Sequence, residues 1–422
     1  MHLPIIKYEH EVLDIKGEGL KKRDFDALIG LNNQHGNKYF TIEPNGIRFK
    51  QYVGVIQLNE RTIEIRPKAD KHNDDATKSK WQNVLVDMLR ACGKVKINPY
   101  ENAQLEKGTL SLLELYFDQY LSEVQLLLRN GLVKQYRKEA SNVKALKGKL
   151  DFAQNIRHNL VHKERFFTLH QVYDVDHKIH QVLGQAIDIV KQFSTNMWIN
   201  DKCRRVQLEF PEVKKIQATK QLLDSIQLNR KTAPYERALE LARLIILNYS
   251  PNISQGNEKM ISILFNMNQL WEEYVLTRLR QASRTHPTIK VLGKKVKTFW
   301  GSNRLEPDIV IEKGGETYII DTKWKTPGTS TSVQDLRQMY AYGRFWNANR
   351  IMLLYPGDSG TTEFIPFLND EYLPINSETN NQELMKHECM KGFVSVLTKG
   401  NHEKNNLDGD IGIRIFEMFQ LI

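Results

Sequence analysis

Three side chains that can take part in acid, base or metal chemistry lie close together in the last third of the sequence: Asp308, Asp321 and Lys323. Asp308 belongs to the strand-like segment EPDIVIE, and the other two belong to the strand-like segment ETYIIDTKWK. Between these segments, Gly314-Gly315 has the composition of a two-residue hairpin loop. The sequence therefore predicts that all three side chains share one antiparallel hairpin.

The register of this hairpin decides whether the two acids meet. If the Gly-Gly dipeptide forms the loop, paired residue numbers sum to 629, so Asp308 lies opposite Asp321. Cβ atoms of opposed residues are about 4.5–5.5 Å apart, and two carboxylates at that distance repel each other unless a cation lies between them. The same register places Glu306 opposite Lys323, which the strand period of two puts on the face of Asp321.

Such a cluster has the donor types of a metal-dependent hydrolase. Hard oxygen ligands favour Mg²⁺ or a similar ion, which can hold a water molecule and a phosphate oxygen together. Lys323 can then stabilise charge on the scissile phosphate or help to deprotonate the attacking water. We therefore expect phosphodiester hydrolysis, with Asp308 and Asp321 as metal ligands and Mg²⁺ as cofactor. The alternative is an ordinary exposed pair of Asp321 and Lys323 beside a turn.

The segments around the hairpin predict the order α-β-β-β-α-β, which would form a mixed sheet with helices packed on its faces. The expected ranges are a helix at 260–280, strands at 289–300, 306–312 and 316–325, a helix at 333–347 and a strand at 350–355. The order Pro307-Asp308, then Asp321-Thr-Lys323, resembles the PD-(D/E)XK nuclease superfamily, whose fold core has this element order. The resemblance implies a carboxy-terminal α/β domain like that of restriction endonucleases.

The resemblance also implies that a glutamate from the preceding helix assists, and two candidates are adjacent. Glu272 neighbours Val275 and Leu279 at helical spacing and so borders the buried face, whereas Glu273 neighbours Arg280. We therefore predict Glu272 as a catalytic residue and third metal ligand. The alternative is that both glutamates are exposed to solvent.

Gln338 and Tyr342 stand four residues apart in the second expected helix and so share one helix face. The pair resembles the QxxxY motif of the RecB-like branch of these nucleases. That resemblance implies that both side chains meet DNA or metal-bound water. Ordinary packing of an amphipathic helix is the alternative explanation for Tyr342.

Longer segments throughout the chain are similar to the McrC family, the nuclease subunits of McrBC-type modification-dependent restriction systems. These segments are YVGVIQLNERTIEIRPK from residue 52, LKGKLDFAQNIRHN from 146, NQLWEEYVLTRL from 268, RLEPDIVI from 304, IIDTKWK from 319 and DLRQMYAYGRFW from 335. The similarity implies a Mg²⁺-dependent endodeoxyribonuclease of type IV restriction. It further implies an amino-terminal domain that docks on a McrB-like AAA+ GTPase hexamer and stimulates it.

The chain as a whole is expected to be an α+β multidomain protein. We predict a β-rich partner-docking domain at 1–100, a helical linker or DNA-facing region at 101–250 and the nuclease domain at 251–422. In the first domain, strands are expected at 39–42, 52–58 and 62–65; in the second, helices near 110–128, 179–193 and 235–247. The basic segment 134–149 is interpreted as a solvated helix face plus loop, or alternatively as a phosphate-facing surface. Loops are expected at 70–80 and, with one short helix, at 377–406.

Composition supports a polyanionic partner such as DNA. Sixty Lys and Arg against fifty Asp and Glu give 422 residues a net charge of +10, and phosphate contacts supply most non-specific affinity for nucleic acids. No apolar run approaches the ~20 residues that span a bilayer, and the first residues lack a signal peptide's layout. We therefore expect no membrane partner and a cytoplasmic protein. Its three cysteines, Cys92, Cys203 and Cys389, are expected to be reduced.

The sequence contains no GxxxxGK[ST] phosphate loop, so an energy-dependent step must come from a partner. Two other functions are also compatible with the sequence. One is a non-catalytic adaptor or activator that holds DNA for a AAA+ motor. The other is a nuclease of the PD-(D/E)XK superfamily that works with a different motor or with none.

Overall fold

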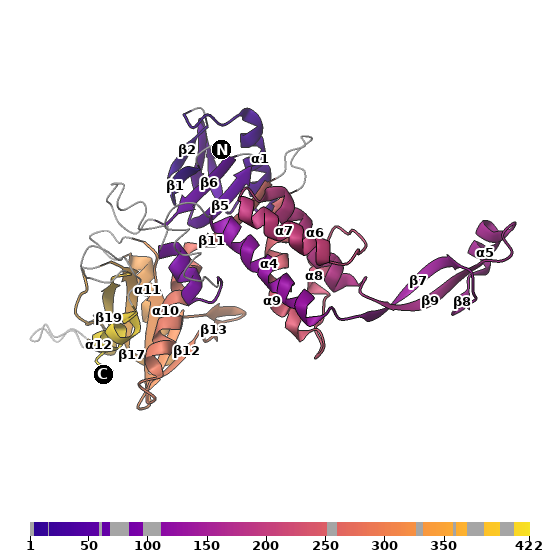
Figure 1. The fold of residues 1–422 in the computed structure, drawn as a ribbon. Helices are drawn as coiled ribbons and strands as arrows, with labels where there is room; N and C mark the ends of the chain where they lie inside the picture. Colours follow the sequence, from indigo (N-terminus) through magenta and orange to yellow (C-terminus); the bar gives the residue numbers. More distant parts are fainter. Residues whose placement is uncertain are drawn as a thin grey trace, which may run out of the picture.

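The computed structural model describes residues 4–15, 17–58, 61–67, 84–95, 111–250, 260–325, 332–357, 360–368, 384–396 and 409–422. Figure 1 shows a sheet-containing lobe at the amino terminus, a helical region, a carboxy-terminal lobe and a long arm that projects from the helical region. Within the described ranges, no helix is both long and apolar enough to cross a bilayer. The expected loop at 70–80 lies outside these ranges.

The amino-terminal lobe contains two sheets and one helix. The larger sheet has the strand order β1 (Ile5–Tyr8), β6 (Arg61–Arg66), β5 (Tyr52–Leu58), β11 (Met260–Asn266) and β10 (Tyr249–Ser250). The smaller sheet has the order β2 (Val12–Asp14), β4 (Gly46–Phe49) and β3 (Phe40–Glu43), and α1 spans Lys22–Gln34. The strands predicted at 52–58 and 62–65 are confirmed, because β5 and β6 pair antiparallel with Leu58 opposite Arg61.

Strand β11 corrects one sequence prediction. The helix expected from residue 260 is wrong at its start, because 260–266 form a strand that pairs antiparallel with β5. The mainly apolar run MISILF is buried on both faces over Met260–Ile263, and a nearly continuous run of this kind does not distinguish a strand from a buried helix. Gly54 lets β11 approach: a Cβ there would stand 2.0 Å from the carbonyl oxygen of Ile263. The predicted domain division thus remains a prediction, with β11 completing the amino-terminal sheet.

The helical region consists of α4 (Leu112–Asn130), α6 (Lys178–Phe193), α7 (Met197–Glu209), α8 (Lys220–Asp224), the 3-10 helix η1 (Ala233–Tyr235) and α9 (Glu236–Leu247). Helices were predicted near three of these positions, and α4, α6 and α9 confirm them. Helix α4 begins at a capping box in which Ser111 and Glu114 satisfy each other's backbone N–H groups, and it ends before Gly131. These helices bury their apolar faces in a core continuous with that of the amino-terminal sheet.

A buried ion pair joins α4 to α7. Lys202 Nζ lies 2.5 Å from Asp118 Oδ1 and 2.6 Å from Ser122 Oγ, and both charged side chains are almost fully buried. Removing one partner of such a pair leaves an uncompensated buried charge, which typically costs about 3–5 kcal/mol. We therefore expect Lys202→Met to lower the unfolding free energy by that amount in denaturant titration.

The exposed pair of Arg243 and Asp224 provides the control, since exposed ion pairs contribute only about 0–1 kcal/mol. The double change Asp118→Leu with Lys202→Met should recover most of the loss, because it removes both charges. If Lys202→Met destabilised no more than Arg243→Ala, the assignment of a structural ion pair would be wrong.

The arm corrects the prediction for the basic segment 134–149. Instead of a helix face and loop, the chain forms β7 (Gln135–Val143), which pairs with β9 (Phe166–Asp174) over nine residue pairs. The short strand β8 (Lys149–Leu150) and helix α5 (Phe152–Asn159) lie at its far end (Figure 1). Thr168 is the one buried residue of these two strands, and their other residues are half-buried or exposed. The strands therefore show no alternation of apolar and polar residues in the sequence. The middle region is therefore not entirely helical.

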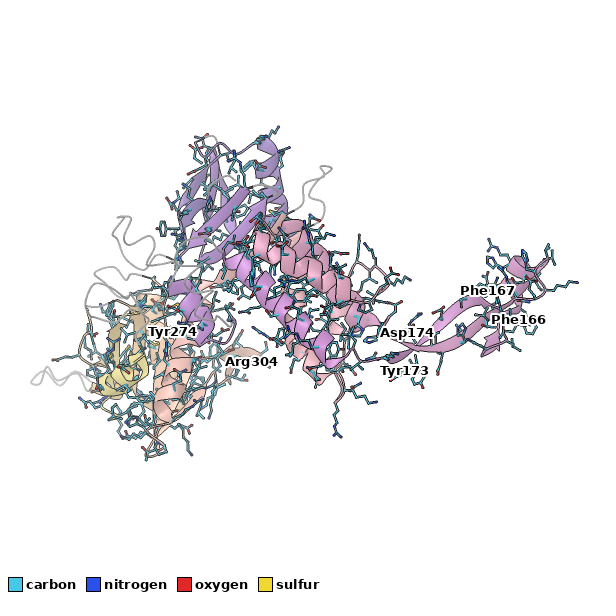
Figure 2. The ribbon with its side chains drawn as sticks, viewed as in Figure 1. Phe166, Phe167, Tyr173, Asp174, Tyr274 and Arg304 are labelled. Carbon is cyan, nitrogen blue, oxygen red and sulfur yellow. The ribbon has the colours of Figure 1, made fainter. Side chains whose placement is uncertain are left out.

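Paired side chains hold the base of the arm. Tyr136 and Tyr173 pack against each other across the two strands, with ring centroids 4.7 Å apart and ring planes inclined by 38°. Arg137 makes a bidentate contact with Asp174 at 2.8–3.2 Å. Figure 2 labels Tyr173 and Asp174 near the helices and Phe166 and Phe167 toward the opposite end. The ribbon thus holds α5 away from the rest of the molecule.

The carboxy-terminal lobe is a mixed six-stranded sheet with helices on both faces. Its strand order is β12 (Lys290–Gly293), β15 (Ile309–Lys313), β16 (Glu316–Thr322), β17 (Ala348–Pro356), β19 (Leu384–Val394) and β18 (Ile365–Leu368). Helix α10 (Met267–Ser283) packs with α12 (Ile411–Met418), and α11 (Val333–Trp346) packs on β16, β17 and β19. The expected α-β-β-β-α-β order is present, with further strands added.

Two strand predictions in this lobe are corrected. The expected strand at 289–300 is divided into β12 and β13 (Lys297–Trp300), and β13 forms a separate ribbon with β14 (Asn303–Leu305). The loop and short helix expected at 377–406 are wrong for 384–394, which form β19 parallel to β17. The sequence of β19 mixes apolar and charged residues without a regular alternation, so this strand is recognised by its pairing with β17 rather than by its own pattern.

Candidate active site

The hairpin of β15 and β16 has the predicted register. Ile309 pairs with Ile320 and Lys313 with Glu316, and both loop glycines, Gly314 and Gly315, have positive φ. Positive φ at both central positions is what a type I′ turn requires. Asp308 immediately precedes β15, and Asp321 lies in β16 beside it. The two acids are therefore brought to the same end of one hairpin.

This end of the hairpin lies under α11. Val310 and Ile319 each stand two residues from one of the acids and so lie on the same face of the hairpin, where they share a buried cluster with Met339 and Tyr342 of α11. Asp321 is 2% exposed, whereas Asp308 is partly accessible. The acids thus form the boundary between a dry apolar layer and solvent.

Lys323 makes the shortest contact of the cluster. Its Nζ lies 2.6 Å from Asp321 Oδ2 and 3.9 Å from Asp335 Oδ1. Asp308 is held differently, because its Oδ2 accepts from the backbone N–H and the hydroxyl of Thr322 at 2.7 and 2.8 Å. These bonds fix the carboxylate of Asp308 beside Asp321. The predicted opposition of Glu306 and Lys323 stays a prediction, because both residues lie beyond the ends of β15 and β16, and the carboxylate of Glu306 lies 3.7 Å from Lys294 Nζ.

Gln338 and Tyr342 connect α11 to the acids. Gln338 Nε2 donates to Tyr342 Oη at 2.7 Å and to Asp321 Oδ1 at 3.4 Å, while Gln338 Oε1 accepts from Lys323 Nζ at 3.5 Å. The hydroxyl of Tyr342 donates to the backbone carbonyl of Glu306 at 2.9 Å. The two side chains therefore position the acids and the segment before Asp308, and direct contact with DNA stays a prediction.

Glu272 approaches the cluster from α10. It pairs with Lys294 at 3.0 Å, while Glu273 pairs with Lys94 at 2.8 Å on a different surface. Burial, and then the charge of Asp308, raises the pKa of Glu272 to about 7. Of the two candidate glutamates, Glu272 is therefore the one that interacts electrostatically with the acids of the site.

The electrostatics of the cluster favour a bound cation. Burial, and then the charge of Asp308, raises the pKa of Asp321 to about 6. Burial alone would lower the pKa of Lys323, but the carboxylates of Asp321, Asp335 and Asp308 outweigh it and raise that pKa. Lys323 is thus held as an ammonium ion, and acidic charge in excess of this one amine remains.

The donor set fits a divalent ion through Asp308 and Asp321, because both are hard oxygen ligands whose mutual repulsion a cation would relieve. Among the residues that the structure describes, no three His, Cys, Asp or Glu side chains are gathered closely enough to hold a metal ion. A third ligand role for Glu272 therefore stays a prediction.

Sequence reasoning missed Asp335 and Thr322 as members of the cluster, and it did not predict that Lys294 pairs with Glu272. Asp335 lies in the first turn of α11, where Ser332 caps the helix, and it contacts Lys325 at 2.8 Å as well as Lys323. Its spacing of three from Gln338 places both on one helix face. That spacing was a usable signal, whereas the contacts of Lys294 and Thr322 depend on tertiary structure.

A hydrogen bond also links the site to the amino-terminal lobe. Trp324 Nε1 donates to Glu9 Oε1 at 2.7 Å, and both side chains are buried. Trp324 follows Lys323 directly and packs against Trp271 of α10. The segment that carries the lysine is therefore anchored on residues next to β1.

We expect Trp324→Phe to lower the unfolding free energy by about 1–3 kcal/mol, because it removes a donor to a buried carboxylate. Cleavage should fall with it, since the mutation loosens the backbone next to Lys323. Trp346→Phe is the matched control: Trp346 is equally buried, and its Nε1 has no hydrogen-bond partner in the described chain. Equal melting temperatures for the two variants would contradict the anchoring role.

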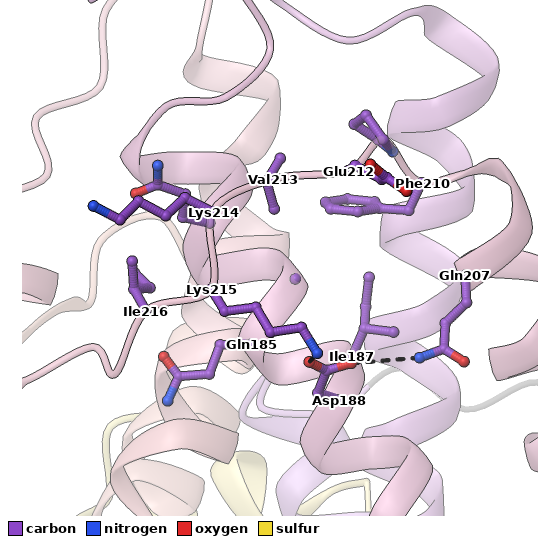
Figure 3. A pocket seen from close by; sticks show the side chains of 13 residues that line it. Gln185, Ile187, Asp188, Gln207, Phe210, Glu212, Val213, Lys214, Lys215 and Ile216 are labelled. Carbon is purple, nitrogen blue, oxygen red and sulfur yellow. Dashed lines mark hydrogen bonds and ion pairs between the residues drawn. The ribbon is translucent and has the colours of Figure 1, made fainter. Parts of the chain in front are cut away.

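A separate pocket of about 500 Å³ lies in the helical region. Figure 3 shows that α6, α7 and the segment after α7 line it, with Lys215 and Gln207 both directed at Asp188. Its polar side chains are engaged locally: Gln181 donates to Asp176, and Gln185 accepts from the backbone of Ala218. No residue of the acidic cluster lines this pocket, so it plays no part in the proposed chemistry.

Comparisons with known proteins agree with the resemblance noted in the sequence. Residues 47–356 match the family model described as the McrBC 5-methylcytosine restriction system component. The curated Escherichia coli K12 protein "Type IV methyl-directed restriction enzyme EcoKMcrBC" is 21% identical over 210 residues, which cover 47% of this chain and 60% of that protein. The chain thus spans about three fifths of the curated relative's length.

A solved structure shares the fold. It is described as the refined half-complex from a tetradecameric assembly of Thermococcus gammatolerans McrB AAA+ hexamers with bound McrC. The matched chain has a TM-score of 0.67 and 19% identity, and the match covers 100% of both chains. At this identity the likeness concerns the fold alone.

Proposed function

Since this chain belongs to the McrBC family of restriction-system components, we propose that it is the McrC-like subunit that cleaves DNA. The proposed reaction is Mg²⁺-dependent hydrolysis of phosphodiester bonds by a carboxy-terminal domain of the PD-(D/E)XK type. One observation carries the proposal: Asp308, Asp321 and Lys323 converge beneath α11, with Lys323 Nζ 2.6 Å from Asp321. A module that only holds DNA has no need of such a cluster, and its acidic charge would repel phosphate.

The residues of the cluster have different roles in the proposed reaction. When bound to Asp308 and Asp321, the cation supplies Lewis-acid activation of the phosphate and lowers the pKa of water. Lys323 stays protonated and offers a positive charge to the phosphate oxygens as negative charge develops. Asp335 and Gln338 hold that amine in place, and Tyr342 holds the segment before Asp308.

Glu272 has a supporting role in this scheme. With a pKa of about 7, its carboxyl group exchanges a proton in the neutral range and can assist proton transfer. Lys294 keeps it beside the site through their 3.0 Å contact.

We place the activity in the cytoplasm, where the protein would meet its DNA substrate.

We further propose that the chain docks on a McrB-like AAA+ GTPase hexamer and stimulates it. The amino-terminal residues 1–100 are the predicted docking surface. The arm is a second candidate surface, because it carries exposed apolar side chains at its far end, among them Phe152, Leu160 and Val161. Solvent exposure of such a group is typical of interaction sites.

The experiment that tests this function is co-purification of the chain with a McrB-like AAA+ protein encoded beside it, followed by cleavage of methylated and unmethylated plasmid with GTP or ATP. Co-purification, GTP-dependent cutting and loss of cutting in EDTA are expected. DNA binding without cutting would favour the non-catalytic adaptor. Cutting that needs no GTPase would favour a nuclease with another motor or none.

A further inference from the structure

The ribbon of β13 and β14 is exposed although it adjoins the acidic cluster. All four residues of β13 are exposed, and Trp300 at its end is 74% accessible. Among the residues that the structure describes, these two strands pair only with each other, around a turn in which Gly301 has positive φ. Figure 2 labels Arg304 on this ribbon, which projects from the lobe that contains α10.

The charge of the ribbon is one-sided. Residues 294–305 include Lys294, Lys295, Lys297 and Arg304 but no acidic residue. The three lysines are engaged within the lobe: Lys294 with Glu272, Lys295 with Glu312, and Lys297 with α11. In the described chain, by contrast, the side chains of Trp300 and Arg304 make no hydrogen bond, ion pair or ring contact. An indole and a guanidinium are therefore free to meet a partner.

The base of the ribbon is fixed to the helix that organises the site. Lys297 Nζ donates to the carbonyl of Phe345 at 2.6 Å and lies 5.0 Å from the ring centre of Trp346. Phe299 meets Phe345 edge to face, with centroids 6.2 Å apart. Both partners belong to the last turn of α11, which also carries Gln338 and Tyr342. The ribbon thus has a defined position relative to the acids.

The distance to the site is short along the chain. Arg304 is four residues before Asp308, so their Cα atoms are at most roughly 14 Å apart. At a rise of about 3.4 Å per base pair, this distance corresponds to about four base pairs of duplex. A phosphate at the acidic cluster would therefore have its neighbours within reach of the ribbon.

We propose that the β13–β14 ribbon lies in a groove of duplex DNA beside the scissile phosphate, with Trp300 packed on the sugars and bases and Arg304 paired with a backbone phosphate. This inference rests on the proposed function. The major groove admits a two-stranded β-ribbon, apolar side chains contact the base edges and thymine methyl groups exposed there, and the positive charge complements DNA. The ribbon would hold the duplex so that the acidic cluster does not have to.

The test is a binding measurement that does not depend on cleavage. The full chain is titrated against a fluorescein-labelled 30-base-pair duplex in EDTA, and anisotropy gives Kd at several salt concentrations. We expect Trp300→Ala to raise Kd roughly 5- to 100-fold, because the apolar surface that the indole buries against the duplex is lost, with partial recovery in Trp300→Phe. Arg304→Ala should reduce the slope of log Kd against log salt by about one.

Arg204→Ala is the matched control, because it removes the same charge from an exposed position on α7. It should change Kd and slope less than Arg304→Ala, and all variants should keep the wild-type melting temperature. Unchanged affinity in Trp300→Ala, or no duplex binding by the wild-type chain, would overturn the proposal. A Trp300→Ala variant that lost binding to the AAA+ partner but kept its DNA affinity would also overturn the proposal, because the ribbon would then contact protein. Ribbon-dependent binding without any cleavage would overturn the proposed function alone.

Discussion

Replacing Lys323 with Ala is expected to lower the DNA cleavage rate by at least about 100- to 1,000-fold, effectively abolishing it. The ammonium group is held 2.6 Å from Asp321, with Asp335 nearby, and the carboxylates around it keep it protonated. Loss of one preorganised charge that stabilises a transition state typically has an effect of this size. The measurement is single-turnover cleavage of labelled DNA at saturating Mg²⁺.

The same variant should leave binding to the AAA+ partner and GTPase stimulation nearly intact, because Lys323 lies in the site and contacts α11 rather than the proposed docking surfaces. Lys290→Ala removes an exposed lysine from β12 of the same lobe and should cleave at the wild-type rate. Normal cutting by Lys323→Ala would contradict the catalytic assignment. Equal losses of cutting and of GTPase stimulation would indicate a structural defect instead.

Replacing Asp321 with Asn is expected to abolish cleavage and, without metal, to stabilise the fold. Burial and the charge of Asp308 raise the pKa of Asp321 from 3.8 to about 6. The folded protein therefore binds this proton more tightly than the unfolded chain does. The stability that the group contributes is complete below pH 3.8 and is lost as the pH rises through about 6.

Asn has no such titration, so the melting temperature of Asp321→Asn should exceed that of the wild type most clearly above pH 6.5. Mg²⁺ should narrow the difference, because the cation would stabilise only the protein that retains the carboxylate. Thermal unfolding from pH 4 to 8, with and without Mg²⁺, measures both effects. Asp201→Asn changes an exposed carboxylate on α7 and should show neither. A lower melting temperature for Asp321→Asn at pH 8 would contradict this account.

The features of the site that could be predicted from the sequence are those determined by interactions between residues close together in the chain. The Gly-Gly turn fixes the register of β15 and β16, and the register brings Asp308 and Asp321 together. Helix α11 follows from its own periodicity, which places Gln338 and Tyr342 on one face. These features depend on residues only a few positions apart, so a single sequence is sufficient to infer them.

The features that were missed depend on distant partners. Strand β11 is a mainly apolar run whose pairing with β5 is settled by tertiary contacts, and β19 is recognisable only beside β17. In the arm, one face of the ribbon is exposed and the other is only half-buried, so its strands show no regular alternation of apolar residues. Glu9 and Trp324 are 315 residues apart, and no pattern in either segment predicts that they meet.

The most direct measurement is the position of Mn²⁺ in crystals of the full chain, located by anomalous scattering. We predict one strong peak between the carboxylates of Asp308 and Asp321, and loss of that peak in Asp308→Asn. Mn²⁺ absent from these carboxylates at saturating concentration, or bound equally well in Asp308→Asn, would contradict this prediction.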